Sequence, residues 1–227
     1  VTAMVITREF NENEFLMMVT RKGTVKRIPF VSLKTNRKAG IRAITLDEDD
    51  HLISVIRTGG DDNIILATAF GYAICFNEND VRIMGRDAAG VRGILLTDGD
   101  YVVGAEKAEE GKTLLTVTQN GYGKRTALTE YLRTGPNGEK QAQSKGLKNY
   151  NITPKTGNVA GCRVVGENDD VMLIENGGVI IRIPASSINV YKRDVQGVIV
   201  MRIDDGNQVV SLERVEKMDE EETGEQS

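Results

Sequence analysis

The sequence contains four copies of one hairpin pattern, and this repetition constrains the fold more than any other feature. Each copy is an apolar run, a turn that contains glycine and a second apolar run. The turn glycines are separated by 48, 50 and 56 residues. Such a period fits the blades of a propeller better than helical repeats, whose apolar residues would recur about every 3.6 positions. The copies are FLMMVTRKGTVKRIP, IILATAFGYAICF, LLTVTQNGYGKRTAL and VMLIENGGVIIRIP, with turn glycines Gly23, Gly71, Gly121 and Gly177.

Two further segments recur with each hairpin. One is a glycine flanked by cations, and the other is an acidic or glycine-rich turn followed by an apolar strand. We therefore predict an all-β array of four units with about four strands each, whose continuous apolar runs are buried on both faces. The array begins in mid-unit, because VTAMVIT lacks the turn that should precede it. The cation-flanked glycines are Gly40, Gly90, Gly146 and Gly197.

Charge separates the repeats from the end of the chain. The net charge is −4, and residues 216–227 carry six acids and one lysine. We predict a repeat domain over residues 1–215 and a disordered acidic tail over residues 216–227. The tail is interpreted as a solubilising terminus, with competition for a bound anion as the alternative. The third unit is the longest, and residues 133–143 are expected to form an exposed loop.

Residues for catalysis or metal binding are scarce. His51 is the only histidine and lies in an acidic turn, while Cys75 and Cys162 are far apart in the sequence. These residues cannot form a zinc site or a histidine-based triad within the chain. Asp47–Asp50 is interpreted as a solvated turn, and EKAEEGKT lacks the first glycine of a phosphate-binding loop. The sequence predicts a non-catalytic chain without a metal or cofactor.

Membrane insertion is not expected. The longest weakly polar run, Ile64–Phe76, is too short to span a bilayer, and the sequence shows no signal-peptide pattern. We therefore expect a cytoplasmic protein.

Lysines and arginines recur in phase with the units. Lys124 and Arg125 follow the third turn, and Lys26 and Arg27 stand at the same offset in the first unit. Arg182 comes one position later in the fourth unit. In a ring of similar blades these positions would form a basic belt, which suits duplex DNA because of its closely spaced phosphates. The alternative is that each cation is an ordinary solvated residue. The predicted DNA-binding residues are Lys26, Arg27, Arg37, Lys38, Arg42, Arg86, Arg92, Lys124, Arg125, Lys145, Lys148, Arg182, Lys192, Arg193 and Arg202.

Several of these segments resemble a known family. TQNGYGKRT at Thr118–Thr126 is similar to a signature segment of the DNA gyrase A C-terminal domain. GRDAAGVRGILLTDGDYVVG, GGVIIRIPASSI and VQGVIVMRI resemble the same family, as does the acidic tail. The resemblance runs from Val1 to about Val215.

The resemblance implies a six-bladed β-pinwheel, in which neighbouring blades exchange strands and duplex DNA wraps around the outer edge with positive handedness. The wrap supports negative supercoiling by the parent type II topoisomerase, whose ATP hydrolysis and cleaving tyrosine lie elsewhere. The implied partners are double-stranded DNA, the remaining parts of gyrase A and, through them, gyrase B, in the bacterial cytoplasm at the nucleoid. The alternatives are the C-terminal domain of the corresponding chain of topoisomerase IV and a propeller-like platform for protein interaction.

The sequence departs from the family in one respect. The family's seven-residue box, with glutamine, basic residues and glycines, has no full copy here. The nearest segments are NRKAGIR at Asn36–Arg42 and QSKGLK at Gln143–Lys148. We expect that the first two of six blades are missing, and that the four units bind DNA without wrapping it fully.

Overall fold

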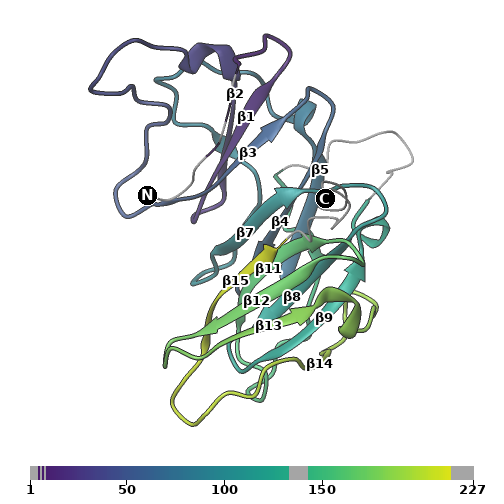
Figure 1. Cartoon of the computed structure of the whole chain (residues 1–227). Helices are drawn as coiled ribbons and strands as arrows, with labels where there is room; N and C mark the ends of the chain where they lie inside the picture. The colour runs from purple at the N-terminus through teal and green to yellow at the C-terminus, as the bar shows by residue number, and fades with distance from the viewer. Residues whose placement is uncertain (1–4, 6, 8, 133–142, 216–227) are drawn as a thin grey trace, which may run out of the picture.

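The computed structural model describes residues 5, 7, 9–132 and 143–215, and within them the chain is all-β (Figure 1). The only helices in this part are four short 3-10 turns, and none is long and apolar enough to cross a membrane. The predicted tail and nearly all of the predicted loop at 133–143 lie outside the described residues. The domain boundary at residue 215 therefore stays a prediction.

The strands follow the predicted repeat. The first unit contains β1 (Phe15–Thr20), β2 (Thr24–Pro29), η1 (Phe30–Leu33) and β3 (Leu52–Thr58). The second contains β4 (Asn63–Thr68), β5 (Tyr72–Asn77), η2 (Glu78–Asp80), β6 (Val91–Arg92) and β7 (Val102–Lys107). The third contains β8 (Thr113–Thr118), β9 (Tyr122–Ala127), η3 (Leu128–Glu130), β10 (Leu147–Lys148) and β11 (Val159–Val165). The fourth contains β12 (Asp170–Glu175), β13 (Ile180–Pro184), η4 (Ala185–Ser187), β14 (Val198–Ile199) and β15 (Val209–Val215).

Each hairpin turns at a glycine with positive φ, a conformation that costs glycine little. In the first three units this residue is the predicted turn glycine, with φ between 77° and 81°. In the fourth it is Gly178, with φ 94°, and not Gly177. The amide of Gly178 donates to Glu175 as the amide of Gly121 donates to Thr118, which confirms the equivalence. Arg182 therefore stands at the same offset as Arg125, and the predicted shift of one position was wrong.

Neighbouring units exchange a short strand. The hydrogen-bonded order is β3-β1-β2-β6 in the first sheet, β10-β5-β4-β7 in the second and β11-β8-β9-β14 in the third. The two-residue strands β6, β10 and β14 thus each belong to the unit that follows the sheet they complete. This confirms a pinwheel array of four-stranded blades with exchanged strands for the first three sheets.

The long strands beside each hairpin form the inside of the array. β7 packs against both β3 and β11, and β11 also packs against β15. One stretch from each of these four strands lines a shared cavity of about 280 Å³. Since β3, β7, β11 and β15 are inside, β6, β10 and β14 at the opposite edges form the outer rim. The first strands of the first three hairpins are almost fully buried, as their continuous apolar runs predicted.

The fourth sheet has only three strands, β13-β12-β15, within the described residues. The outer edge of β13 therefore has no strand beyond it, and Ile180 is 55% exposed. The first unit shows the reverse situation. Its glycine Gly40 has φ 75°, close to the 77° of Gly146 and the 74° of Gly197, but no atom lies within 4 Å of the position a Cβ would take. Among the residues that the structure describes, β13 thus has a sheet edge without a neighbouring strand, and Gly40 has no host strand packed against it.

Candidate nucleic-acid interface

The two cations that follow the first and third turns are buried. Lys26 and Lys124 are 0% exposed, and Arg27 and Arg125 are 4% exposed. Their strands lie in the middle of their sheets, because β6 and β14 cover the outer edges of β2 and β9. A phosphate cannot reach a side chain that other strands and loops enclose. The expectation that these four residues touch DNA directly disagrees with their burial.

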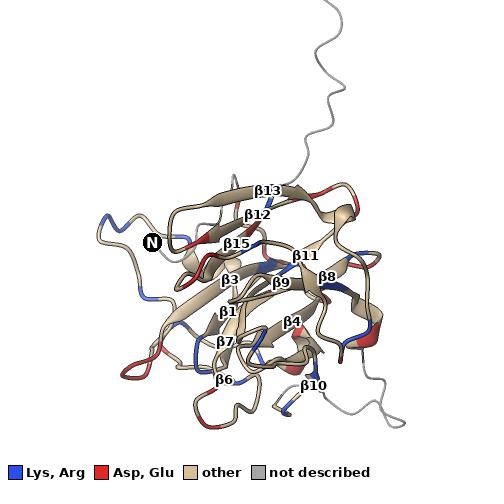
Figure 2. Cartoon of the chain, turned by 90° about the horizontal axis from the view of Figure 1, so that it is seen from below, with Lys and Arg blue, Asp and Glu red and all other residues tan. Residues whose placement is uncertain are grey.

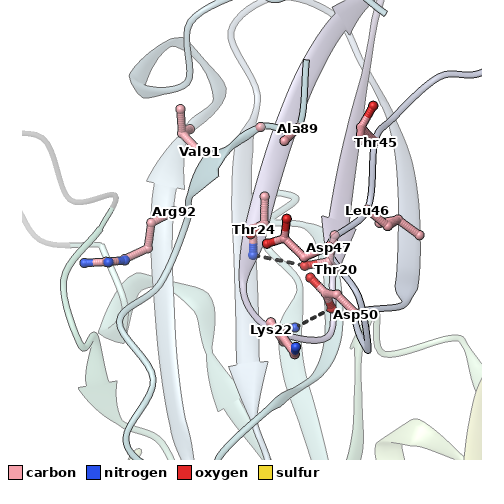
Figure 3. Close-up of a pocket in the computed structure, with 11 residues that line it drawn as sticks. Thr20, Lys22, Thr24, Thr45, Leu46, Asp47, Asp50, Ala89, Val91 and Arg92 are labelled. Atoms are coloured by element: carbon pink, nitrogen blue, oxygen red, sulfur yellow. Dashed lines mark hydrogen bonds between the residues drawn. The ribbon is translucent and has the colours of Figure 1, made fainter. Parts of the chain in front are cut away.

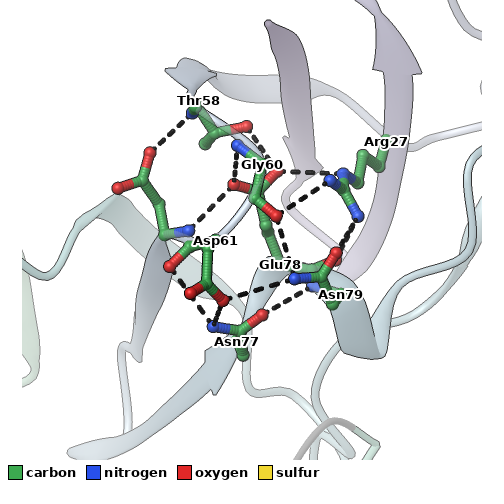
Figure 4. Close-up of polar contacts among 9 residues, drawn as sticks. Arg27, Thr58, Gly60, Asp61, Asn77, Glu78 and Asn79 are labelled. Carbon is green, nitrogen blue, oxygen red and sulfur yellow. Dashed lines mark hydrogen bonds and ion pairs between the residues drawn. The ribbon is translucent and has the colours of Figure 1, made fainter. Parts of the chain in front are cut away.

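Arg27 joins the first unit to the second through an ion pair (Figure 4). Its Nε lies 2.9 Å from Oε2 of Glu78, in an orientation that makes an ion pair and not a hydrogen bond. The carboxylate of Glu78 is fully buried and accepts hydrogen bonds from the Thr58 hydroxyl at 2.7 Å, the Gly60 amide at 2.7 Å and the Asp62 amide at 2.9 Å. Burial of a charged pair requires such additional partners. Arg27 thus holds two blades together.

Arg125 makes an equivalent junction between the third and fourth units. Its Nε donates to the carbonyl of Ile188 at 2.6 Å, and its Nη1 lies 2.8 Å from Oε1 of Glu167. The Glu167 side chain is 67% exposed, so this ion pair is more exposed to solvent than the pair of Arg27 and Glu78. Arg182, at the same offset, is 55% exposed and pairs with Asp170 at 2.8 Å. Sequence reasoning missed Glu78 and Glu167, whose long separation from the arginines leaves no local signal.

Most of the other predicted cations are exposed. Arg92 and Lys148 lie on the rim strands β6 and β10, and Figure 2 shows blue segments in the loops beside these strands. Arg193 is partly covered, with 31% of its side chain exposed, and its Nη1 donates to the carbonyl of Lys148 at 3.0 Å. Lys145 lies over the ring of Tyr72 at 4.4 Å. The exposed members of the predicted set are Arg37, Lys38, Arg42, Arg86, Arg92, Lys145, Lys148, Arg182, Lys192 and Arg202.

Three successive units carry exposed cations in the corresponding loop, although not at the same position within it. Arg86, Lys145 and Lys192 each lie in the loop that leads to the rim strand of their unit. Within the described residues, Arg86 and Arg92 have no carboxylate partner, so their charges are available to an anion. Sequence reasoning missed the exposed Arg82, which lies in the same loop as Arg86 but apart from the cation-flanked glycine.

The cation-flanked glycines allow the rim strand to cross its host strand closely. A Cβ on Gly90 would lie 2.7 Å from the carbonyl oxygen of Val25, and the corresponding atoms would clash at Gly146 and Gly197. All three glycines also have positive φ. No residue other than glycine meets both conditions without strain. Strand exchange therefore accounts for these three glycines.

A hollow of about 260 Å³ lies beside β6, between the first hairpin turn and the acidic turn at 47–50 (Figure 3). Lys22 and Arg92 line it together with Asp47 and Asp50. Oδ1 of Asp50 accepts hydrogen bonds from the amides of Lys22 at 2.9 Å and His51 at 2.8 Å, so this carboxylate fixes the turn. No group of three metal-ligating side chains occurs within the described ranges. The mixed charges make this hollow a poorer anion site than the open rim.

A comparison with known proteins agrees with the four units seen in the structure. A sequence profile described as "DNA gyrase C-terminal domain, beta-propeller" matches residues 14–58, 62–109, 112–140 and 169–216. The chain is 40% identical over 222 residues to the DNA gyrase A protein of Klebsiella oxytoca and 42% identical over 221 residues to that of Clostridium acetobutylicum. Each alignment covers 97% of this chain but only 25% and 26% of the respective relative. The chain therefore spans about a quarter of the length of these curated relatives.

Solved structures show the same fold. A DNA gyrase A C-terminal domain superposes with a TM-score of 0.79 at 26% identity, over 92% of this chain and 68% of that one. The C-terminal domain of a DNA topoisomerase IV superposes with a TM-score of 0.84 at 28% identity, over 92% of this chain and 64% of that one. The sequence relatives favour gyrase over topoisomerase IV, and the four matched segments follow the four units. The chain belongs to the DNA gyrase A C-terminal domain family.

Proposed function

We propose that this chain binds duplex DNA along the outer rim formed by β6, β10, β14 and the loops that precede them. The observation that carries the proposal is the exchange of a short strand between units. It places a loop with an exposed cation at the outside of three successive blades. Duplex DNA presents one phosphate charge about every 1.7 Å along its axis, so a rim of separated cations can follow it. Such contacts position DNA without reading its sequence.

The direct contacts that we propose exclude the four buried cations. The proposed direct contacts also include Arg182, which is weaker because Asp170 already pairs with it. The other proposed contacts are Arg37, Lys38, Arg42, Arg86, Arg92, Lys145, Lys148, Lys192, Arg193 and Arg202. Lys26, Arg27, Lys124 and Arg125 contribute instead by holding the blades and loops in place. The basic pair after the hairpin turn can therefore recur with the repeat because of its structural role, without contacting DNA.

In the whole protein, we propose that the rim bends DNA for a gyrase. The cost of bending is on the order of several kcal/mol, and contacts along the rim offset it. The chain itself carries no catalytic role in this proposal. Its partners are the remaining parts of gyrase A and, through them, gyrase B, in the bacterial cytoplasm at the nucleoid. Membership of the gyrase A family supports this assignment.

The salt dependence of DNA binding tests the proposed rim. Removing two phosphate contacts should lower the magnitude of the slope of log K against log salt by about 2, and should weaken binding equally for unrelated sequences. The variant is Arg86→Ala with Arg92→Ala. Its matched control is Lys107→Ala with Lys112→Ala, which removes the same charge from ion-paired positions away from the rim. If both double variants change the slope equally, general charge and not the rim binds the DNA.

Wrapping is tested separately. Nicked circular plasmid is sealed in the presence of the chain, and its linking number is compared with that of a protein-free control. A positive shift means that these four units impose a chiral wrap. No shift, at concentrations where a salt-sensitive complex forms, limits the chain to binding. Salt-insensitive binding to protein partners alone would instead support the interaction platform.

A further inference from the structure

We infer that Lys26 and Lys124 are positioning residues, whose buried ammonium groups hold the basic rim loop of the next unit by its backbone carbonyls. Neither side chain touches solvent, and each reaches from the hairpin of its own unit into the loop of the unit that follows. The inference deepens the proposed function, because it concerns the loops that present Arg86, Lys192 and Arg193.

The contacts of Lys124 carry the argument. Its Nζ donates to the carbonyl oxygens of Lys192 and Arg193, at 2.6 Å each, and lies 3.2 Å from the hydroxyl of Thr126. Two successive carbonyls that turn inward toward one ammonium fix the path of the backbone between them. Charged donors make hydrogen bonds roughly twice as strong as neutral ones, so a buried ammonium is well suited to this task.

Lys26 makes the same arrangement in the first unit. Its Nζ donates to the carbonyls of Arg86 at 2.5 Å and Ala88 at 2.6 Å, both in the loop before β6. It also donates to Ala43 at 2.8 Å, which lies just after Gly40 in its own unit. In two separate units, one lysine ammonium thus donates to two backbone carbonyls of the following loop. This repetition indicates that the contact is a feature of the repeat.

The surrounding backbone contacts are also equivalent. The amide of Met84 donates to Arg27 and the amide of Tyr191 donates to Arg125, each joining the loop to the residue after the buried lysine. These contacts hold the beginning of the loop, and the exchanged strand holds its end. The ammonium holds the middle, where the exposed cations lie.

Two units lack this lysine. Ile74 and Ile181 stand at the equivalent positions, three residues after Gly71 and Gly178. An apolar side chain is therefore compatible with the hairpin itself. What lysine adds is a set of contacts with the next loop, and this separates a positioning role from a general need for the side chain in folding.

Hydrogen–deuterium exchange of the full chain without DNA tests the inference. In Lys124→Ile, backbone amides in residues 189–200 should exchange at least tenfold faster, while amides of β8 and of the first unit keep their protection. The control Lys107→Ile also removes one lysine, but from an inner strand, and should leave the loop unchanged. If the loop amides of Lys124→Ile exchange as slowly as those of the unmodified chain, the inference is overturned.

DNA binding then separates this inference from the proposed function. If the inference and the proposed function are both correct, Lys124→Ile reduces the magnitude of the slope of log K against log salt by roughly 2. The reason is that two rim cations lose their positions, although Lys124 itself touches no phosphate. If the unmodified chain shows no salt-sensitive binding, the proposed function fails, whereas the exchange result still decides the inference. If the loop loosens and the slope stays constant, the loop cations are not DNA contacts.

A measurement on the unmodified chain covers the case in which Lys124→Ile does not fold. Nuclear magnetic resonance of side-chain ammonium groups should show slow solvent exchange for Lys124 and through-space contacts with residues 192 and 193. A rapidly exchanging ammonium without those contacts overturns the inference.

Discussion

The buried pair of Arg27 and Glu78 gives the sharpest prediction on stability. Glu78→Ala leaves the guanidinium of Arg27, whose side chain is 5% exposed, without its carboxylate. It also removes the acceptor of the Thr58 hydroxyl and of two amides. Breaking a buried pair by removing one partner costs about 3–5 kcal/mol. With a urea m-value of about 2 kcal/mol/M, the unfolding midpoint should fall by about 2 M.

The equivalent junction of Arg125 supplies the matched control. Glu167→Ala removes a carboxylate that is 67% exposed, and Arg125 keeps its hydrogen bond to the carbonyl of Ile188. Exposed pairs contribute about 0–1 kcal/mol, so the midpoint should move by less than about 0.5 M. Circular dichroism in urea measures both variants, since the chain has no tryptophan. Equal effects of the two substitutions would refute the argument that burial decides the difference.

A double variant separates the lost pair from the lost acceptor. Arg27→Met with Glu78→Gln removes both charges but keeps an oxygen for the amides of Gly60 and Asp62. Replacing both partners of a buried pair costs far less than removing one. The double variant should recover at least half of the stability that Glu78→Ala loses. A double variant as unstable as Glu78→Ala would show that the ion pair is not the source of the cost.

Three further predictions concern single positions. Gly197→Ala should destabilise the chain by about 1–3 kcal/mol more than Gly40→Ala, because both glycines have positive φ but only at Gly197 would the added Cβ lie 2.4 Å from the carbonyl oxygen of Gly123; equal loss of thermal stability would contradict this. Burial lowers the pKa of Lys124 from 10.5 to about 8. Between these two pH values the Lys124 amine is therefore protonated more fully in the unfolded chain than in the folded one. The free energy of unfolding should therefore rise with pH across that window more in the unmodified chain than in Lys124→Ile, and parallel pH profiles would count against it. Burial raises the pKa of Cys75 and Cys162 to about 12, so neither thiol should react with a thiol reagent at pH 8 until the chain unfolds, and rapid labelling of the native chain would oppose this.

The repeat itself was readable from the sequence because its signals are local. A tight turn needs glycine, and a strand buried on both faces needs a continuous apolar run. Gly23, Gly71 and Gly121 were identified correctly as turn residues for this reason. The error at Gly177 also has a local cause, because two adjacent glycines in ENGG both permit the turn and only the hydrogen bond of Gly178 distinguishes them.

The exposed part of the candidate site was partly readable for the same reason. Arg86, Lys145 and Lys192 lie near a glycine in the second, third and fourth units, and the structure leaves them exposed in loops beside the rim. Gly90 shows the limit of this reasoning. Its presence was correctly noticed, but its role depends on the carbonyl of Val25, which belongs to another unit.

By itself, the sequence determined that the chain is a four-unit β array with basic residues in phase with its period. Only the tertiary structure decided which of those cations face solvent. Lys124 and Lys148 are both lysines in phase with the repeat, yet one is enclosed and the other exposed. The difference arises because a strand from the next unit covers β9, whereas β10 is itself the outermost strand of its sheet. Exposure depends on neighbours brought together by strand exchange over many residues, and no local pattern records which side chain they will cover.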